Sequence, residues 1–341
     1  MKKLLFVSLY NEKIHVHFDA SMLIMYLSLY PDAEFLFFWN KKHLDAVLQL
    51  VPMSHKVKKI PCRSNLAISI SFLYFIKTFF LRGAYRVDLC GLFTSPLYFL
   101  VGLSQNECIL HVPWWHNKRR LRYISWFFNF YLVNFFNQNL RIMNLWKWVF
   151  ESYMRNLSIP KVFKNKFFWI THPFLINKAS VSLLHNSEPV FWFFGLQNRP
   201  HKGTNDADHI KSFIRWLSGN VFWGEKFISV ESFYPKVDYV VLSYLQNYHY
   251  LCSGVFIESI AYGKTIICFK NPICDYFFEK YGPICYAVSS MQELESLLTL
   301  LIHSWIKNNK IFTENLEKAS ADLTNPAFIT DLYARNIIQQ D

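Results

Sequence analysis

Short apolar runs, each bounded by polar turn residues, recur along the first half of the chain. They predict buried β-strands at Leu4–Leu9, Glu34–Phe38, Glu107–Val112 and Phe167–Ile170. Longer segments with the apolar spacing of helices separate these runs, as at Ala20–Leu29 and Leu66–Leu81. Strand and helix in alternation are typical of a doubly wound α/β fold with a parallel sheet.

The same alternation starts again after Thr171-His172-Pro173 and the polar stretch 177–189. The second series predicts strands at Val190–Phe194, Asp238–Ser243 and Thr265–Phe269, and helices at Asp206–Leu217 and Gly254–Tyr262. From Met291 the pattern is helical almost to the end. Seven of the ten glycines follow residue 171, which provides the tight strand-to-helix turns that phosphate sites need. We expect two domains, at 1–172 and 173–325.

Composition agrees with two packed domains. The chain has 341 residues, of which 52% are hydrophobic and 18% charged, and this excludes a disordered protein. The seven cysteines contain no C-x-x-C pair, which indicates reduced thiols and argues against a zinc site or a disulfide framework. The most apolar stretch, Ala67–Leu81, contains Lys77 and is shorter than the ~20 residues of a membrane span.

The opening residues MKKLLFVSLY mimic a signal peptide, but the apolar run stops at Asn11-Glu12-Lys13 without a small-residue cleavage site. They are better interpreted as the first strand of a parallel sheet. We therefore expect a protein of the cytoplasm.

The net charge of +12 is concentrated in one block. Residues 51–170 hold 17 lysines and arginines against three acidic residues, a net charge of +14, and aromatic rings lie among the bases from Pro113 to Phe136. This pattern suits an anionic membrane surface, which attracts bases and accepts aromatic rings at its interface. An aromatic core helix with a basic edge is the structural alternative. Nucleic acid is a weaker one, because no recognised nucleic-acid motif is present.

The most informative stretch is Ser253-Gly-Val-Phe-Ile-Glu258-Ser-Ile-Ala-Tyr-Gly263-Lys-Thr-Ile-Ile. Ser253 is a typical helix N-cap, and Gly254 lets a ligand approach the N–H groups of the first turn. Glu258 lies one turn further on and could accept hydrogen bonds from ribose hydroxyls. A plain strand–helix unit with a surface Glu is the alternative. The chain has no G-x-G-x-x-G, Walker A, H-E-x-x-H or G-x-S-x-G motif, which argues against the enzyme classes that use them.

That stretch resembles the donor-site helix of GT-B glycosyltransferases, in particular family 4-like and bacterial surface polysaccharide enzymes. The segment Phe193-Phe-Gly195-Leu-Gln-Asn-Arg199-Pro-His-Lys202-Gly203 is similar to the family's FFGxxRxxKG segment, and Asp238–Tyr244 resembles its intervening strand. The three motifs occur in family order across about 190–290. The resemblance implies a GT-B fold, in which two Rossmann-like domains face each other across a cleft and a last helix, here 326–341, crosses back to the N-terminal domain.

By the same resemblance, Gly195, Arg199, Lys202, Ser253, Gly254 and Glu258 form the donor site. Arg199 and Lys202 would neutralise the diphosphate, and Glu258 would hold the ribose. GT-B enzymes usually work without a bound metal, so we expect no cofactor and no metal ligands, with a UDP- or GDP-linked sugar as substrate. The only D-x-D, Asp206-Ala-Asp208, starts a helix and is interpreted as a cap. Tyr250 stands where many retaining members have a second Glu, which leaves inversion or retention open.

A catalytic base for an inverting reaction should come from the N-terminal domain. The two candidates are His111, near the end of a predicted strand, and Asp19, expected in a loop after His15-Val-His17-Phe. His172 is expected at the hinge between the domains.

These observations predict a glycosyltransferase that moves a sugar from a nucleotide-sugar donor to a glycan acceptor. We expect the acceptor to be linked to a lipid and the reaction to belong to the assembly of a bacterial surface polysaccharide. The expected location is the cytoplasm, peripheral on the inner face of the membrane, with no nucleic-acid partner. The alternatives are a non-catalytic GT-B-like binding module and a basic nucleic-acid-binding protein.

Overall fold

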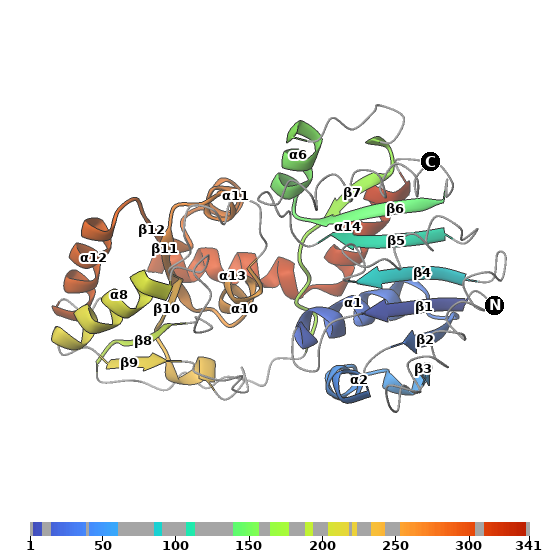
Figure 1. Cartoon of the computed structure of the whole chain (residues 1–341), viewed down its shortest axis with the longest axis horizontal. Coiled ribbons are helices and arrows are strands. Elements are labelled where there is room, and N and C mark those ends of the chain that lie inside the picture. Colours follow the sequence, from blue (N-terminus) through green and yellow to red (C-terminus); the bar gives the residue numbers. More distant parts are fainter. Residues whose placement is uncertain are drawn as a thin grey trace. The chain divides into compact units, whose positions relative to one another are not determined.

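The computed structural model describes residues 3–8, 15–38, 41–60, 85–90, 107–112, 139–156, 164–176, 188–193, 204–217, 220–223, 233–242, 253–303 and 310–338. The chain forms two compact units (Figure 1). Unit 1 comprises 1–176 and 326–341, and unit 2 comprises 177–325. Every strand pair among the described residues is parallel, which confirms the expected α/β class.

Unit 1 is built on a seven-stranded sheet with the order β3-β2-β1-β4-β5-β6-β7. Its strands are β1 (Lys3–Ser8), β2 (Glu34–Phe38), β3 (Val57–Ile60), β4 (Tyr85–Cys90), β5 (Glu107–Val112), β6 (Leu140–Leu145) and β7 (Phe167–Ile170). Its helices are α1 (Val16–Leu29), α2 (Lys41–Gln49), α6 (Lys147–Asn156) and α14 (Pro326–Ile338), with a 3₁₀ turn at Ser54–Lys56. The chain winds outward from β1 in both directions, which is the doubly wound arrangement.

Helix α1 is the central helix of unit 1. Every residue from Phe18 to Leu27 is buried, including the polar Asp19 and Ser21. A helix that is apolar on all sides belongs inside a core, and α1 packs against both α2 and α14. The Ser21 hydroxyl accepts a hydrogen bond from the N–H of Leu175 at 2.9 Å, so the helix is also tied to the segment after β7.

Helix α14 belongs to unit 1 although it follows all of unit 2 in the sequence. It packs against β7 and α1 (Figure 1). The Tyr333 ring meets the Tyr26 ring edge-on with centroids 5.6 Å apart, and Asn336 Nδ2 donates to the carbonyl of Trp169 at 2.9 Å. The segment 326–338 therefore completes the core of unit 1.

Unit 2 is built on a five-stranded sheet with the order β12-β11-β10-β8-β9. Its strands are β8 (Val190–Phe193), β9 (Asn220–Trp223), β10 (Tyr239–Leu242), β11 (Thr265–Phe269) and β12 (Cys285–Val288). Its helices are α8 (Thr204–Trp216), α10 (Gly254–Ala261), α11 (Pro272–Tyr281), α12 (Met291–His303) and α13 (Lys310–Thr324), with a 3₁₀ turn at Tyr234–Lys236.

The two faces of this sheet carry different helices. Alternate strand residues such as Phe191, Val241 and Ile267 join buried residues of α8 and α12 in one apolar cluster. On the other face α10 and α13 pack against each other and against β11. The sheet is thus covered on both sides, which explains why its strands are nearly continuous apolar runs.

Within the described part of the chain, no helix combines the length and the apolar character needed to cross a membrane. The segments 66–81 and 113–136, the first an expected helix and the second the basic aromatic stretch, lie outside the described residues.

Candidate functional site

The sheet of unit 2 reverses its direction of winding between β8 and β10. The chain leaves β8 for β9 at one edge and then returns to β10 on the other side of β8. In open α/β sheets, ligands bind outside the carboxyl ends of the strands at such a switch point. Here these ends are Phe193 and Leu242, and the helices that follow them are α8 and α10.

Ser253 caps the helix that follows β10. Its backbone is extended, and its hydroxyl accepts a hydrogen bond from the N–H of Phe256 at 3.2 Å. The first turn of a helix presents N–H groups without intrahelical partners and the positive end of the helix dipole. The N-terminus of α10 is therefore suited to bind an anion such as a phosphate.

Gly254 is the first residue of α10, and no described atom lies within 4 Å of the position that a Cβ would take there. Its backbone is not one that requires glycine. As far as the described residues are concerned, the missing side chain leaves space beside the first turn, as close approach of a ligand to the backbone would require.

Glu258 lies one helical turn after Gly254, on the same side of α10. It is half-buried, whereas its neighbours Ile257 and Ser259 are buried in the unit. The structure thus places Ser253, Gly254 and Glu258 together in the first two turns of one helix, at the switch point of the sheet. The predicted donor-site residues Gly195, Arg199 and Lys202 lie outside the described residues, between Phe193 of β8 and Thr204 of α8.

Two charged residues of unit 2, the half-buried Asp238 and the buried Lys264, lie at the opposite, amino ends of the strands. Asp238 precedes β10, and its carboxylate accepts a hydrogen bond from the N–H of Val190 at 2.9 Å. Lys264 precedes β11; burial lowers its pKa to about 8, and Asp238 opposes this shift. Since both residues lie at the amino ends of the strands, they do not belong to the candidate site at the carboxyl ends.

In unit 1, His111 is the fifth residue of β5, and its backbone is in register with Cys90 of β4 and Met143 of β6. It is therefore close to the carboxyl end of a central strand, as the sequence predicts. Its role as a catalytic base stays a prediction.

Asp19 does not lie in a loop, and that expectation is corrected here. Helix α1 begins at Val16, so that Asp19 is in its first turn and is fully buried. Its Oδ2 atom is 3.1 Å from Nε2 of His43, an equally buried residue of α2. The sequence does not single out His43, because it lies in an amphipathic helix with no motif around it.

Further histidines lie near the start of α1. His15 precedes the helix with a left-handed backbone, φ 64° and ψ 23°, which non-glycine residues adopt rarely. The ring of His172 packs against Phe18 with centroids 4.8 Å apart, and that of His17 lies edge-on to Phe174. Burial lowers the pKa of His172 to about 4; its hydrogen bond to the Pro173 carbonyl opposes the shift, and His15 adds to it.

This environment makes unit 1 sensitive to acid. The unfolded chain binds a proton at His172 below about pH 6.5, whereas the folded chain does so only near pH 4. Stability therefore falls as the pH drops from 6.5 to 4, by roughly 3 kcal/mol in total from this group. We expect His172→Gln to abolish this part of the pH dependence.

The measurement is urea unfolding of the full chain at pH 7 and pH 4.5, with unit 1 followed by pulsed hydrogen-exchange labelling. The control is His55→Gln, which changes an exposed histidine and should keep the wild-type pH dependence. Equal pH dependence in wild type and His172→Gln would contradict the prediction.

Comparison with known proteins identifies the fold. No protein-family model and no curated protein sequence matches the chain significantly. Among solved structures, HepE of Anabaena in complex with UDP is similar with a TM-score of 0.67 at 12% identity, and the match covers 99% of this chain and 100% of that one. A second crystal structure of HepE contains UDP-glucose.

Two further structures are similar over nearly their whole length. A glycosyltransferase of Rickettsia africae has a TM-score of 0.62 at 12% identity, with 99% of this chain and 97% of that one covered. Sucrose-phosphate synthase of Thermosynechococcus elongatus has a TM-score of 0.62 at 10% identity, with 99% of each chain covered. At this identity the likeness concerns the fold, and it confirms the GT-B fold that the motifs predict.

Proposed function

We propose that the chain is a glycosyltransferase that transfers a sugar from a nucleotide diphosphate sugar to a glycan acceptor. The observation that carries this proposal is the first two turns of α10, where the Ser253 cap, Gly254 and Glu258 lie together at the switch point of the unit 2 sheet. The GT-B fold over the whole chain supports it, and so does HepE, which has this fold and was solved with UDP-glucose. A uridine diphosphate donor is accordingly the first to test, and a guanosine diphosphate donor the second.

In this reaction the bond between the sugar C1 and the diphosphate oxygen breaks, and C1 bonds to an acceptor hydroxyl oxygen. The leaving diphosphate gains negative charge, which fixed cations and helix N–H groups can stabilise. We assign this task to Arg199, Lys202 and the first turn of α10, and the ribose hydroxyls to Glu258. The acceptor proton passes to a base, for which we retain His111, because the carboxylate of Asp19 is buried against His43. No step needs a metal ion.

The acceptor in this proposal is lipid-linked, and the enzyme works on the inner face of a bacterial membrane during surface polysaccharide assembly. The sequence supports this through the net charge of +14 in residues 51–170 and the aromatic rings among those bases. Such a surface attracts anionic headgroups and lets Trp and Phe enter the interface.

The test is a transfer assay of the full chain with UDP-, GDP-, CMP- and dTDP-sugars, preceded by a thermal-shift screen. A bound donor at 100 times its dissociation constant stabilises the fold by about 2.7 kcal/mol, so the correct nucleotide should raise the melting temperature clearly. We expect transfer or slow donor hydrolysis that persists in EDTA. Binding without any turnover would indicate a non-catalytic module, and complete loss in EDTA would overturn the metal-free mechanism.

Glu258→Gln should weaken nucleotide binding. A hydrogen bond to a charged group contributes about 1.5–3 kcal/mol, and the neutral amide accepts ribose protons less strongly, so we expect a loss of roughly 10- to 150-fold in affinity for the nucleoside diphosphate. Isothermal titration calorimetry measures it directly. The matched control is Glu279→Gln, an exposed glutamate of α11. Wild-type affinity in the Glu258 variant would assign Glu258 a structural role.

Membrane binding should depend on the bases among the aromatic residues. We expect co-sedimentation with anionic vesicles that decreases with salt, and a strong decrease when Lys118, Arg119, Arg120 and Arg122 are all changed to Gln. The control changes four exposed lysines elsewhere, Lys41, Lys42, Lys236 and Lys318, and so removes the same charge. Equal losses in both variants would show an effect of net charge alone. Equal binding to neutral and anionic vesicles would contradict the prediction.

A further inference from the structure

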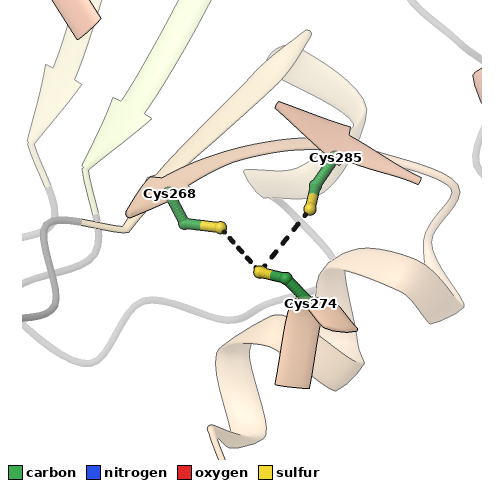
Figure 2. Close-up of side chains that lie close together, drawn as sticks. All are labelled: Cys268, Cys274 and Cys285. Carbon is green, nitrogen blue, oxygen red and sulfur yellow. Dashed lines mark hydrogen bonds between the residues drawn. The ribbon is translucent and has the colours of Figure 1, made fainter. Parts of the chain in front are cut away.

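Three cysteines of unit 2 lie side by side in the structure. Cys268 is in β11, Cys274 in the first turn of α11 and Cys285 at the start of β12. Figure 2 shows their sulfur atoms pointing toward one another. Cys274 Sγ is 3.3 Å from Cys268 Sγ and 3.8 Å from Cys285 Sγ, and all three sulfurs lie within 4.8 Å of one another.

The fold of this strand–helix–strand segment brings them together. Strands β11 and β12 are parallel neighbours, with Cys268 opposite Ala287 and Ile266 opposite Cys285. Helix α11 connects these strands and starts at the carboxyl end of β11. The three cysteines are free and almost fully buried, with relative exposures of 2%, 1% and 2%.

The spacing of the sulfurs matches a metal ion bound by thiolates. A point equidistant from three sulfurs so arranged lies roughly 2.1–2.4 Å from each, and a zinc–thiolate bond is ~2.3 Å long. Sulfur ligands select thiophilic ions such as copper(I) and zinc(II). Within the described ranges, no fourth His, Cys, Asp or Glu ligand atom joins this cluster.

The position of Cys274 favours the thiolate form that a metal needs. It lies at the N-terminus of the ten-residue helix α11, where the helix dipole stabilises negative charge, and its N–H donates to Oδ1 of the Asn271 cap at 3.2 Å. The start of α11 therefore suits a thiolate ligand at Cys274.

We propose that Cys268, Cys274 and Cys285 bind one thiophilic metal ion through their three sulfur atoms. On binding, the three thiols release three protons, and three metal–sulfur bonds form. Three ligands without a fourth among the described residues favour copper(I), since zinc in structural sites is almost always four-coordinate. The bound ion connects β11, α11 and β12, and it stabilises the folded form of unit 2.

The experiment uses the full chain, reduced and kept anaerobic, and supplies copper(I) in competition with a chromophoric copper(I) chelator. Zinc(II) is supplied in a parallel series with a zinc indicator. We expect one copper(I) ion per chain, a thiolate-to-metal absorption band in the ultraviolet, and an increase in melting temperature. No binding of either ion by the wild-type chain would overturn the proposal. If the chain binds zinc(II) more tightly than copper(I), the metal has a fourth ligand, and the three-coordinate site that we propose is wrong.

Cys274→Ser should lower the affinity by about 100-fold or more, because losing a direct ligand costs more than the 10- to 100-fold typical of residues that only orient ligands. The matched control is Cys108→Ser, which changes a buried cysteine of β5 outside the cluster. Unchanged affinity in Cys274→Ser, or equal loss in Cys108→Ser, would contradict the assignment.

If Cys274→Ser does not fold, Cys285→Ala serves as the second variant. X-ray absorption of the loaded wild-type chain needs no variant and should count three sulfur neighbours around the metal. Nitrogen or oxygen neighbours alone would overturn the proposal.

Discussion

Asp19→Ala should destabilise unit 1 by about 1–3 kcal/mol, the cost of leaving a buried hydrogen-bonding group without its partner. Asp19 and His43 are both fully buried, and the change leaves the His43 Nε2 atom without its carboxylate partner. It also opens space in α1, where every neighbouring residue is buried. The opening free energy of α1 amides, measured by native-state hydrogen exchange on the full chain, tests this.

The control is Asp32→Ala, which changes an exposed aspartate of the same unit and should alter stability by less than about 0.5 kcal/mol. Changing both buried partners to apolar residues, as in Asp19→Leu with His43→Leu, should recover part of the loss. If Asp19→Ala keeps wild-type stability but loses transferase activity, Asp19 is a catalytic residue after all, and its structural assignment is wrong.

Arg199→Ala and Lys202→Ala should each reduce sugar transfer, and together they should lower kcat by roughly 10²- to 10³-fold. Removing a single preorganised group that stabilises transition-state charge has an effect of this size. We expect this reduction mainly in kcat, with a smaller change in KM, because the diphosphate gains charge as the sugar–phosphate bond breaks.

Arg215→Ala is the matched control, since it removes an exposed arginine near the end of α8 and should leave kcat unchanged. Wild-type turnover in the double variant would show that other groups meet the leaving diphosphate. Melting temperatures of all variants should stay close to wild type, which separates a loss of chemistry from a loss of fold.

The strands that the sequence predicts well are nearly continuous apolar runs, in which His111 of β5 is the one polar residue inside a strand. The runs Glu34–Phe38, Glu107–Val112, Phe167–Ile170 and Thr265–Phe269 coincide with β2, β5, β7 and β11. Buried parallel strands consist of continuous apolar residues, so their ends are marked by the first polar residue. For these elements the local pattern and the tertiary environment agree.

The apolar pattern does not predict some other strands, because polar or charged residues interrupt them. Strand β3 contains Lys58 and Lys59, which an edge strand tolerates, and Lys58 pairs with Glu34 of β2. In β6, Arg141 donates to the carbonyl of Asn165, and Asn144 is buried with its amide 3.5 Å from the carbonyl of Phe168. The partners of Lys58, Arg141 and Asn144 lie on neighbouring segments, which a local pattern does not show.

The candidate sites also differ in how far the sequence alone predicts them. Ser253, Gly254 and Glu258 lie within one stretch of six residues, so a helix start and its capping residue are enough to place them. The start of α1 was harder to predict because His15, which has a left-handed backbone and makes no side-chain cap, gives no N-cap signal. The cysteines at 268, 274 and 285 meet only because a strand, a helix and a second strand fold together.

The division of unit 1 between two parts of the sequence affects how the chain is made. Tyr333 of α14 lies 307 residues after Tyr26, its partner in the core, so α14 is synthesised only after the whole of unit 2. At translation rates of about 5–20 residues per second, making residues 177–325 takes roughly 8–30 s. During this interval the apolar surface of α1 lacks the helix that covers it in the finished protein. Molecular chaperones can therefore bind this apolar surface of the nascent chain until α14 has been synthesised and packs against it.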